Sequence, residues 1–115
     1  MPSLAQALDA VGLVTIFAAE KQNAKIIPTQ IIVDNEAGGA QRVITIQDVF
    51  TPAASNGVPG PVLTTIDRLI ITVDNAGWAT IAAEALKELE ILGQMQVAID
   101  VADAGTIATI SWGFN

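Results

Sequence analysis

Three times in this chain an aliphatic run is followed by Asp and then turns through Ala-Gly. The three segments are residues 33–38 (VDNEAG), 73–77 (VDNAG) and 101–105 (VADAG). Asp and Asn hydrogen-bond their own backbone in turns, and Gly adopts the left-handed conformations that tight turns require. We therefore predict that each segment is a hairpin corner between two strands. The first two are near copies at an offset of 40 residues (31 to 71), which predicts two related hairpin units.

Seven stretches rich in β-branched, aromatic or alternating apolar residues surround these corners, and such residues favour strands. The expected strands are residues 13–18, 25–33, 41–50, 62–73, 78–82, 94–101 and 106–114. Pro28 has no backbone N–H to donate to a sheet, so its strand is either an edge strand or carries a bulge at Pro28. Residues 41–50 are mostly apolar with polar residues on both faces, which suits a sandwich strand whose outer side is half-covered by a neighbour.

Two short helices are expected. Ser3 can cap a helix in which positions 4, 7, 8 and 11 are apolar at helical spacing, and Gly12 can end it. Residues 84–93 switch to strong helix formers and end at Gly93. Within this second helix Glu84 and Glu88 lie one turn apart, which we interpret as a solvated face beside Lys87.

The predicted fold class is therefore mainly β. We expect an antiparallel β-sandwich or jelly-roll-like fold with about seven strands, a short N-terminal helix and one short connecting helix. A parallel α/β sheet would need many more helices. At 115 residues the chain is one domain by size. We divide it into an N-terminal arm or helix at 1–12 and a single β-sandwich domain at 13–115.

Residues 51–61 are the one long irregular stretch, and their Pro and Gly content excludes regular structure. We expect an exposed loop of the Ω type. Loops of this length inside compact domains are usually functional, so this loop is a candidate contact with a partner. Its candidate interface residues are Pro52, Asn56, Pro59 and Pro61.

Charge is scarce in this chain. Charged residues make up 15% and apolar residues 51%, against about 25% and 45–50% in ordinary soluble domains. Much of the surface must then be uncharged, and large apolar surfaces mark interaction sites. This composition favours a homo-oligomer or a subunit of a larger protein assembly. The alternative is an Ala-rich monomer, because Ala raises the count of apolar residues.

The net charge of −7 argues against two classes of partner. Nucleic acid and anionic membrane surfaces both require clustered Lys and Arg, and the five basic residues are scattered singly. The N-terminus has no basic segment followed by an apolar run, so we expect synthesis in the cytoplasm without a signal peptide.

Catalytic chemistry has few residues to use. The chain has no His and no Cys, which removes the usual general base, the thiolate nucleophile and most zinc ligands. Carboxylates remain, but no spacing selects a pair from Glu84, Glu88, Glu90, Asp48, Asp67 and Asp100. The corner residues Asp34, Asn35 and Glu36 could offer oxygen ligands to calcium, although turn formation is their commoner role. No glycine motif fits a phosphate. We predict no catalytic residues, no metal, no cofactor and no small-molecule ligand.

The large apolar residues near the ends of the chain complete the set of interface candidates. Trp78, Trp112 and Phe114 could stack on a sugar, but core packing or a subunit interface is the commoner use of such residues. Leu4 and Leu8 belong to the expected N-terminal arm.

These observations lead to a hypothesis about function. The chain is expected to be a non-enzymatic structural subunit, most simply a component of a phage or virus particle such as a capsid decoration or cement protein, acting through homo-oligomeric and particle contacts. Small β-sandwiches of this style are common among such components, and fold alone does not fix function. The alternative is a carbohydrate- or protein-binding β-sandwich module.

Overall fold

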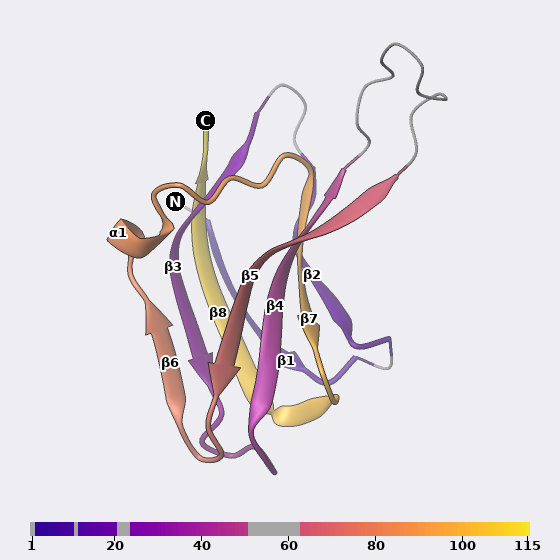
Figure 1. Cartoon of the computed structure of the whole chain (residues 1–115), viewed down its shortest axis with the longest axis vertical. Coiled ribbons are helices and arrows are strands. Elements are labelled where there is room, and N and C mark those ends of the chain that lie inside the picture. The colour runs from indigo at the N-terminus through magenta and orange to yellow at the C-terminus, as the bar shows by residue number, and fades with distance from the viewer. Residues whose placement is uncertain (1, 11, 21–23, 51–62) are drawn as a thin grey trace.

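The structure is a computed structural model, and it describes residues 2–10, 12–20, 24–50 and 63–115. Within them, eight strands form two four-stranded antiparallel sheets in a sandwich-like arrangement (Figure 1). Sheet A has the strand order β1-β8-β3-β6, and sheet B has the order β2-β7-β4-β5. The elements are β1 (Ser3–Leu8), β2 (Val14–Ala18), β3 (Ile26–Asp34), β4 (Arg42–Phe50), β5 (Thr64–Val73), β6 (Trp78–Ile81), α1 (Ala83–Leu86), β7 (Gln94–Ile99) and β8 (Asp103–Phe114).

The core lies between the two sheets and is made by alternate residues of the strands. Ile31 of β3, Ile44 of β4 and Ile110 of β8 are all 0% exposed. The residues directly before and after each of them are half-buried or exposed. Burying a branched aliphatic side chain fully contributes about 1.5–3 kcal/mol relative to leaving it in water. The period of two in the sequence therefore produces two sheets that each have one apolar inner face.

Strand pairing is nested. β1 pairs with β8, β2 with β7, β3 with β6 and β4 with β5, all antiparallel. Among the strands that the structure describes, only β4 and β5 are both consecutive in the chain and paired with each other. The segment that joins them falls in residues 51–62, so the predicted Ω loop lies outside the described residues.

The prediction that the three Asp and Ala-Gly corners close hairpins is wrong. Each corner carries the chain from one sheet to the other: β3 to β4, β5 to β6 and β7 to β8. The two near copies lie on β3 and β5, in different sheets, so they are not equivalent halves of two related hairpin units. The reason is that turn residues specify a reversal of the chain but not which strand receives it as a neighbour.

The predicted N-terminal helix is also wrong, because residues 3–8 form strand β1. Ser3 pairs with Ser111, Ala5 with Thr109 and Ala7 with Ile107. The apolar positions 4, 7, 8 and 11 fit a helix, but a helix between Ser3 and Gly12 is too short to be stable alone. Pairing with β8 instead supplies every second backbone group of residues 3–8 with a partner. All seven predicted strands are present, and β1 is the eighth.

The connecting helix is shorter than predicted. It spans Ala83–Leu86, so Glu88 lies beyond it. Leu86 and Ile91 are 1% and 0% exposed, and five helical steps would place them about 140° apart around a helix. Both reach the core because the helix ends, and Ile91 then exchanges backbone hydrogen bonds of 2.8 and 2.9 Å with Ile26.

Pro28 shows which of its two predicted settings is correct. Strand β3 lies between β8 and β6, so it is an inner strand, and its register against β8 shifts between Pro28 and Gln30. Pro28 therefore marks a bulge.

Among the described residues, no helix is long and apolar enough to cross a membrane.

Candidate interaction surface

The three corners meet at one end of the sandwich, here called the corner end, and Asn35 joins them. Its side chain is 0% exposed. The Asn35 Nδ2 donates to the carbonyl oxygens of Ala40 (2.8 Å) and Asp74 (3.0 Å), and Oδ1 accepts from the Thr106 hydroxyl (2.7 Å). One buried amide thus connects the first corner to the second corner and to the start of β8. A side chain with this role is a structural one.

Asp103 makes a second junction at the corner end. Its Oδ2 accepts from the Gly39 N–H (2.9 Å) and from Arg42 Nη2 (2.9 Å), while Oδ1 accepts from the Gly105 N–H (2.9 Å). The backbone N–H groups of Gly39 and Gly105, and then the Arg42 guanidinium, hold the pKa of Asp103 below its usual value of 3.8. Charged Asp103 therefore stabilises the folded chain.

This lowered pKa predicts a particular dependence of stability on pH. Because the folded-state pKa lies below the unfolded value of 3.8, the contribution of Asp103 is fully present above that value. It is lost as pH falls through the folded-state pKa. We expect Asp103→Asn to be less stable than the wild type at neutral pH. We also expect its free energy of unfolding to decrease less than that of the wild type as the pH falls below 3.8, as measured by urea unfolding at a series of pH values. Asp74→Asn, an exposed carboxylate at the same end, is the control. A wild-type pH profile retained in Asp103→Asn would contradict this role.

Close backbone approach at the corner end gives a further prediction. A Cβ atom on Gly105 would overlap the carbonyl oxygen of Ala37, whereas one on Gly113 of the same strand would meet no atom within 4 Å. We expect Gly105→Ala to lower the free energy of unfolding by about 1–3 kcal/mol, as overpacking does. Gly113→Ala should change it by less than about 0.5 kcal/mol. Equal effects in thermal unfolding would show that the corners do not touch in this way.

Near the opposite end, Asp48 of β4 fixes the segment that follows α1. Its carboxylate is 0% exposed. It accepts hydrogen bonds of 2.9 Å from the Leu92 N–H, the Gly93 N–H and Arg68 Nη2. Arg68 also donates its Nε, at 3.2 Å, so the ion pair has two hydrogen bonds. This arrangement ties the crossing from β6 to β7 onto sheet B.

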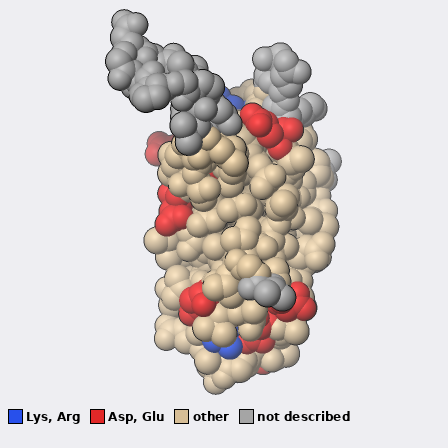
Figure 2. Space-filling model, turned by 90° about the vertical axis from the view of Figure 1, so that its right-hand side faces the viewer, with Lys and Arg blue, Asp and Glu red and all other residues tan. Residues whose placement is uncertain are grey.

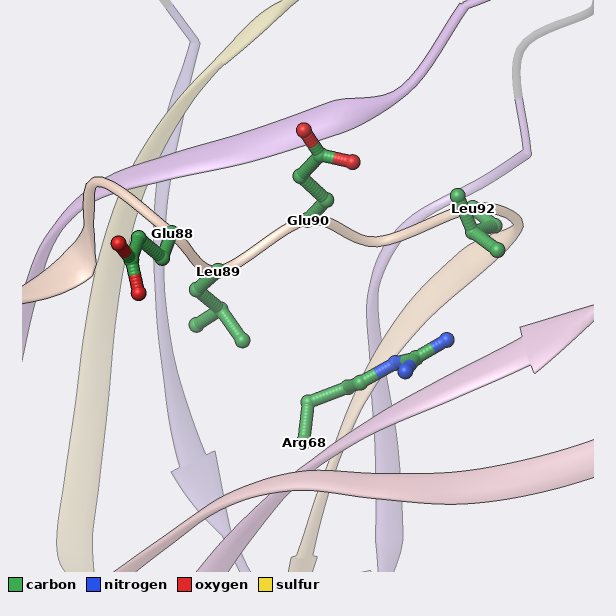
Figure 3. Close-up of a pocket in the computed structure, with 5 residues that line it drawn as sticks. All are labelled: Arg68, Glu88, Leu89, Glu90 and Leu92. Carbon is green, nitrogen blue, oxygen red and sulfur yellow. The ribbon is translucent and has the colours of Figure 1, made fainter.

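A cavity of about 360 Å³ lies beside this ion pair, between β5 and the segment that follows α1 (Figure 3). It is lined by Arg68, Glu88, Leu89, Glu90 and Leu92. The Arg68 guanidinium is already bound to Asp48, and Glu90 pairs with Lys25 at 3.0 Å. Glu88 and Glu90 point in different directions in Figure 3, so they do not form a facing carboxylate pair. In the described part of the chain, no group of three or more metal-binding residue types could hold an ion.

The outer face of sheet B is the more apolar of the two large outer surfaces. It exposes Val14 and Ile16 of β2, Val43 of β4 and Ile70 of β5, at 37%, 57%, 37% and 62%. The register places Val14, Ala98, Thr45 and Ile70 in one row across the four strands. None of the four residues in this row is charged, so the row is neutral.

The next row across sheet B contains Ile16, Gln96, Gln47 and Asp67, and its three polar side chains form a polar row whose members hydrogen-bond one another. Gln47 donates to Asp67 (3.0 Å) and Gln96 donates to Gln47 (2.7 Å), while Gln94, from the row after it, donates to Gln96 (3.4 Å). Gln96 is only 9% exposed, although it lies on an outer face. The side chains of this polar row are therefore ordered by each other, and Asp67 at the margin is the one carboxylate among them.

The outer face of sheet A carries mostly uncharged residues, with Asp34 as its one charged residue among the described strands. Its central row contains Ala5, Thr109, Ile32 and Thr80, in register across the four strands. Trp78 at the margin is 59% exposed and is in register with Asp34.

Charged residues are concentrated outside the strands. Six of them fall in described strands: Asp34, Arg42, Asp48, Asp67, Arg68 and Asp103. Each of the six takes part in a hydrogen bond within the chain. On the side of the molecule shown in Figure 2, acidic residues gather toward both ends and along one margin, and the centre is uncharged.

The structure separates the residues that the sequence offered as interface candidates. Leu8 and Trp112 are 1% and 7% exposed and belong to the core, and Leu4 packs against that core. Trp78 and Phe114 are 59% and 41% exposed, Trp78 on β6 and Phe114 at the end of β8. The four loop candidates, Pro52, Asn56, Pro59 and Pro61, lie outside the described residues.

Sequence reasoning did not identify Ile16, Ile70 or the Gln and Asp row as a surface. The alternation in residues 41–50 was the available signal, because it placed Thr45 and Gln47 on a face opposite to Ile44 and Ile46. Which residues of β2, β5 and β7 share that face depends on strand register, and register is not a local property.

The chain matches no protein-family model, and no curated protein or solved structure is significantly similar to it.

Proposed function

We propose that this chain is a non-enzymatic assembly subunit that packs against neighbouring protein through the outer faces of its sheets. The observation that carries the proposal is the distribution of charge: the outer faces are almost free of it, and the chain's acidic residues lie mainly at the ends and in the connections. A surface of small and branched uncharged side chains loses little on being covered, because few charges must be desolvated.

The use of the buried polar groups also supports a structural role. Asn35, Asp48 and Thr106 are the described polar or charged residues with 0% exposure. Asn35 and Thr106 hydrogen-bond each other across two segments of the corner end, and Asp48 holds Arg68 and two backbone N–H groups. These are the groups from which a buried reaction centre would be built, and in this chain they join segments of the fold.

The nested strand pairing supports a more specific form of this proposal, which concerns the kind of assembly. A chain whose first strand pairs with its last, its second with its seventh and so on is a long hairpin rolled into two sheets, which is the jelly-roll arrangement. Jelly rolls are recurrent in viral capsid proteins and in lectins. We place the subunit in a virion, as a capsid decoration or cement protein of a phage. This step is an analogy at the level of the fold.

Sedimentation equilibrium of the purified chain tests the general proposal. We expect a dimer or larger species at micromolar concentration, or a stable complex with a second protein of the particle. A monomer up to about 100 µM that binds no particle protein would overturn it.

A second candidate function, carbohydrate binding, is favoured by one observation. Trp78 is 59% exposed beside Asp34 on the outer face of sheet A, and an aromatic ring next to a carboxylate suits a sugar. Trp112 is buried, so quenching or enhancement of Trp fluorescence by a panel of glycans would report on Trp78. A specific change that disappears in Trp78→Ala would support this function, and no change with any glycan would remove it.

A further inference from the structure

We propose that two copies of this chain exchange strand β1, driven by strain in the connection that follows it. β1 of each copy would pair with β8 of the other. The binding surface is the edge of β8 that β1 covers in the single chain, and the occupant is residues 3–8 of a second copy. The exchange is symmetric, because each copy gives one strand and receives one. This inference goes beyond the proposed function, because it concerns a sheet edge and not the outer faces.

The fit between β8 and an exchanged β1 is shown by the single chain itself. Residues 3–7 pair antiparallel with residues 107–111, and the Trp112 N–H donates to the Pro2 carbonyl oxygen at 3.0 Å. A second copy carries the same segment, so it would remake each of these backbone hydrogen bonds in the same register. When β1 leaves, the edge of β8 has unpaired N–H and C=O groups, and an added strand satisfies them.

β1 is attached to the rest of the chain mainly through its backbone. It is the first strand and an edge strand, so it can leave without breaking the pairing of the other described strands. Of its six residues only Leu8 is buried, at the end next to the connection to β2. Leu4 and Ala7 are half-buried, and the other three residues are exposed. Few side chains therefore leave the core when β1 is released.

The connection from β1 to β2 is strained in the single chain. Leu13 has a φ of 64°, a left-handed conformation that is unfavourable for a residue with a Cβ. The Leu13 N–H donates to the Ala10 carbonyl oxygen at 3.0 Å and closes a turn, while the Leu13 carbonyl oxygen accepts from the Ile99 N–H at 3.0 Å and fixes this end of the connection to β7. Short connections under strain favour exchange, because the strain is released when the connection straightens.

Leu13→Gly tests the contribution of this strain, because Gly adopts positive φ without a steric penalty. The single chain is then relaxed, and each exchanged dimer no longer gains from releasing two strained connections. We expect the dissociation constant of the dimer, measured by sedimentation equilibrium, to rise at least about tenfold. Leu13→Asn keeps a side chain and tolerates the same φ, so it should act in the same direction.

Ala76 supplies the matched control. It has a φ of 58° in the turn that leads from β5 to β6, so Ala76→Gly releases a similar strain outside the exchanging connection. We expect Ala76→Gly to leave the dissociation constant unchanged. An unchanged dissociation constant in both Leu13→Gly and Leu13→Asn, or an equal rise in Ala76→Gly, would overturn the proposal.

A disulfide can identify which copy supplies the strand that covers β8. Ala5 and Thr109 are register partners. Because position 2 is hydrogen-bonded to position 112, alternation along the ladder makes Ala5 and Thr109 a non-hydrogen-bonded pair, with Cα atoms about 4.5 Å apart. This separation suits a disulfide, and the chain has no Cys of its own. In Ala5→Cys combined with Thr109→Cys, oxidised glutathione should join positions 5 and 109 within one chain in the monomer and between chains in the exchanged dimer.

The double variant is refolded at about 1 µM and at about 1 mM, oxidised, and separated by size exclusion. At the low concentration we expect monomers with an internal disulfide. At the high concentration we expect a dimer fraction that remains covalent on a non-reducing denaturing gel, with the bond between positions 5 and 109 identified by mass mapping of peptides. The single variant Ala5→Cys measures the background of cross-links formed by collision.

Two outcomes of this experiment would overturn the inference. One is a dimer in which every disulfide between positions 5 and 109 lies within a single chain, which would show association through another surface and leave the proposed function standing. The other is a chain that stays monomeric at about 1 mM, and the proposed function would then depend on binding to another particle protein.

Discussion

Replacement of Asn35 by Ala is expected to lower the free energy of unfolding by about 3–5 kcal/mol, with a fall in Tm on the order of 15 °C. The variant removes the donor to two carbonyl oxygens, on Ala40 and Asp74, and the acceptor for the Thr106 hydroxyl. Of the three partners, the Thr106 hydroxyl belongs to a residue that is 0% exposed, and it is left without an acceptor. Chemical and thermal unfolding, followed by circular dichroism, measure the loss.

The internal repeat supplies the matched control. Asn75 occupies the position in the second corner that Asn35 occupies in the first, but its side chain is exposed. Asn75→Ala should therefore change the free energy of unfolding by less than about 0.5 kcal/mol. If the two variants are equally stable, the corner end is not joined through Asn35.

The second large effect is expected at Asp48. Asp48→Ala leaves the Arg68 guanidinium and the N–H groups of Leu92 and Gly93 without their acceptor. Removing one partner of a buried ion pair costs about 3–5 kcal/mol. We expect a loss of that size in urea unfolding, together with faster amide hydrogen exchange at Leu92 and Gly93.

Two further variants separate the ion pair from a general effect of mutation in sheet B. Asp67→Ala removes an exposed carboxylate from the adjacent strand, so its effect should be below about 1 kcal/mol. Asp48→Leu combined with Arg68→Leu replaces both partners by apolar groups, and it should recover part of the loss seen in Asp48→Ala. A double variant as unstable as Asp48→Ala would show that the bonds to the backbone N–H groups carry most of the energy.

The strands could be predicted from the sequence, because β-branched residues and the period of two are local signals. The seven runs predicted as strands are strands, and the bulge at Pro28 follows from its missing N–H. Residues 3–8 could not be assigned in this way. Their apolar spacing fits a helix, and their strand conformation depends on pairing with β8, about 100 residues away along the chain.

The corners show the same limit more clearly. Asp34 accepts a hydrogen bond from the Glu36 N–H at 2.9 Å, which is the local turn chemistry that the sequence predicts. Whether the next strand then joins the same sheet or the other depends on distant partners. The difference between Asn35 and Asn75, one buried and one exposed, also follows from this arrangement and not from their nearly identical flanking residues.

The candidate surface was predictable in kind but not in detail. A chain with 15% charged residues must have large uncharged surfaces. Their location required the register, because a shift of one residue in β5 would exchange Ile70 with the buried Ile71. Trp112 illustrates the converse: its type suggested an interface, and its position on the inner face of β8 places it in the core.

Hydroxyl-radical footprinting of the wild-type chain, compared between dilute and concentrated samples, tests the central claim most directly. The claim is that this chain works by covering its uncharged sheet faces with other protein. We predict that Ile16, Val43 and Ile70 become protected as concentration rises, while Glu36 and Asp74 at the corner end keep their dilute rates. Unchanged rates across the sheet faces in an assembled sample, or protection confined to the corner end, would contradict the account.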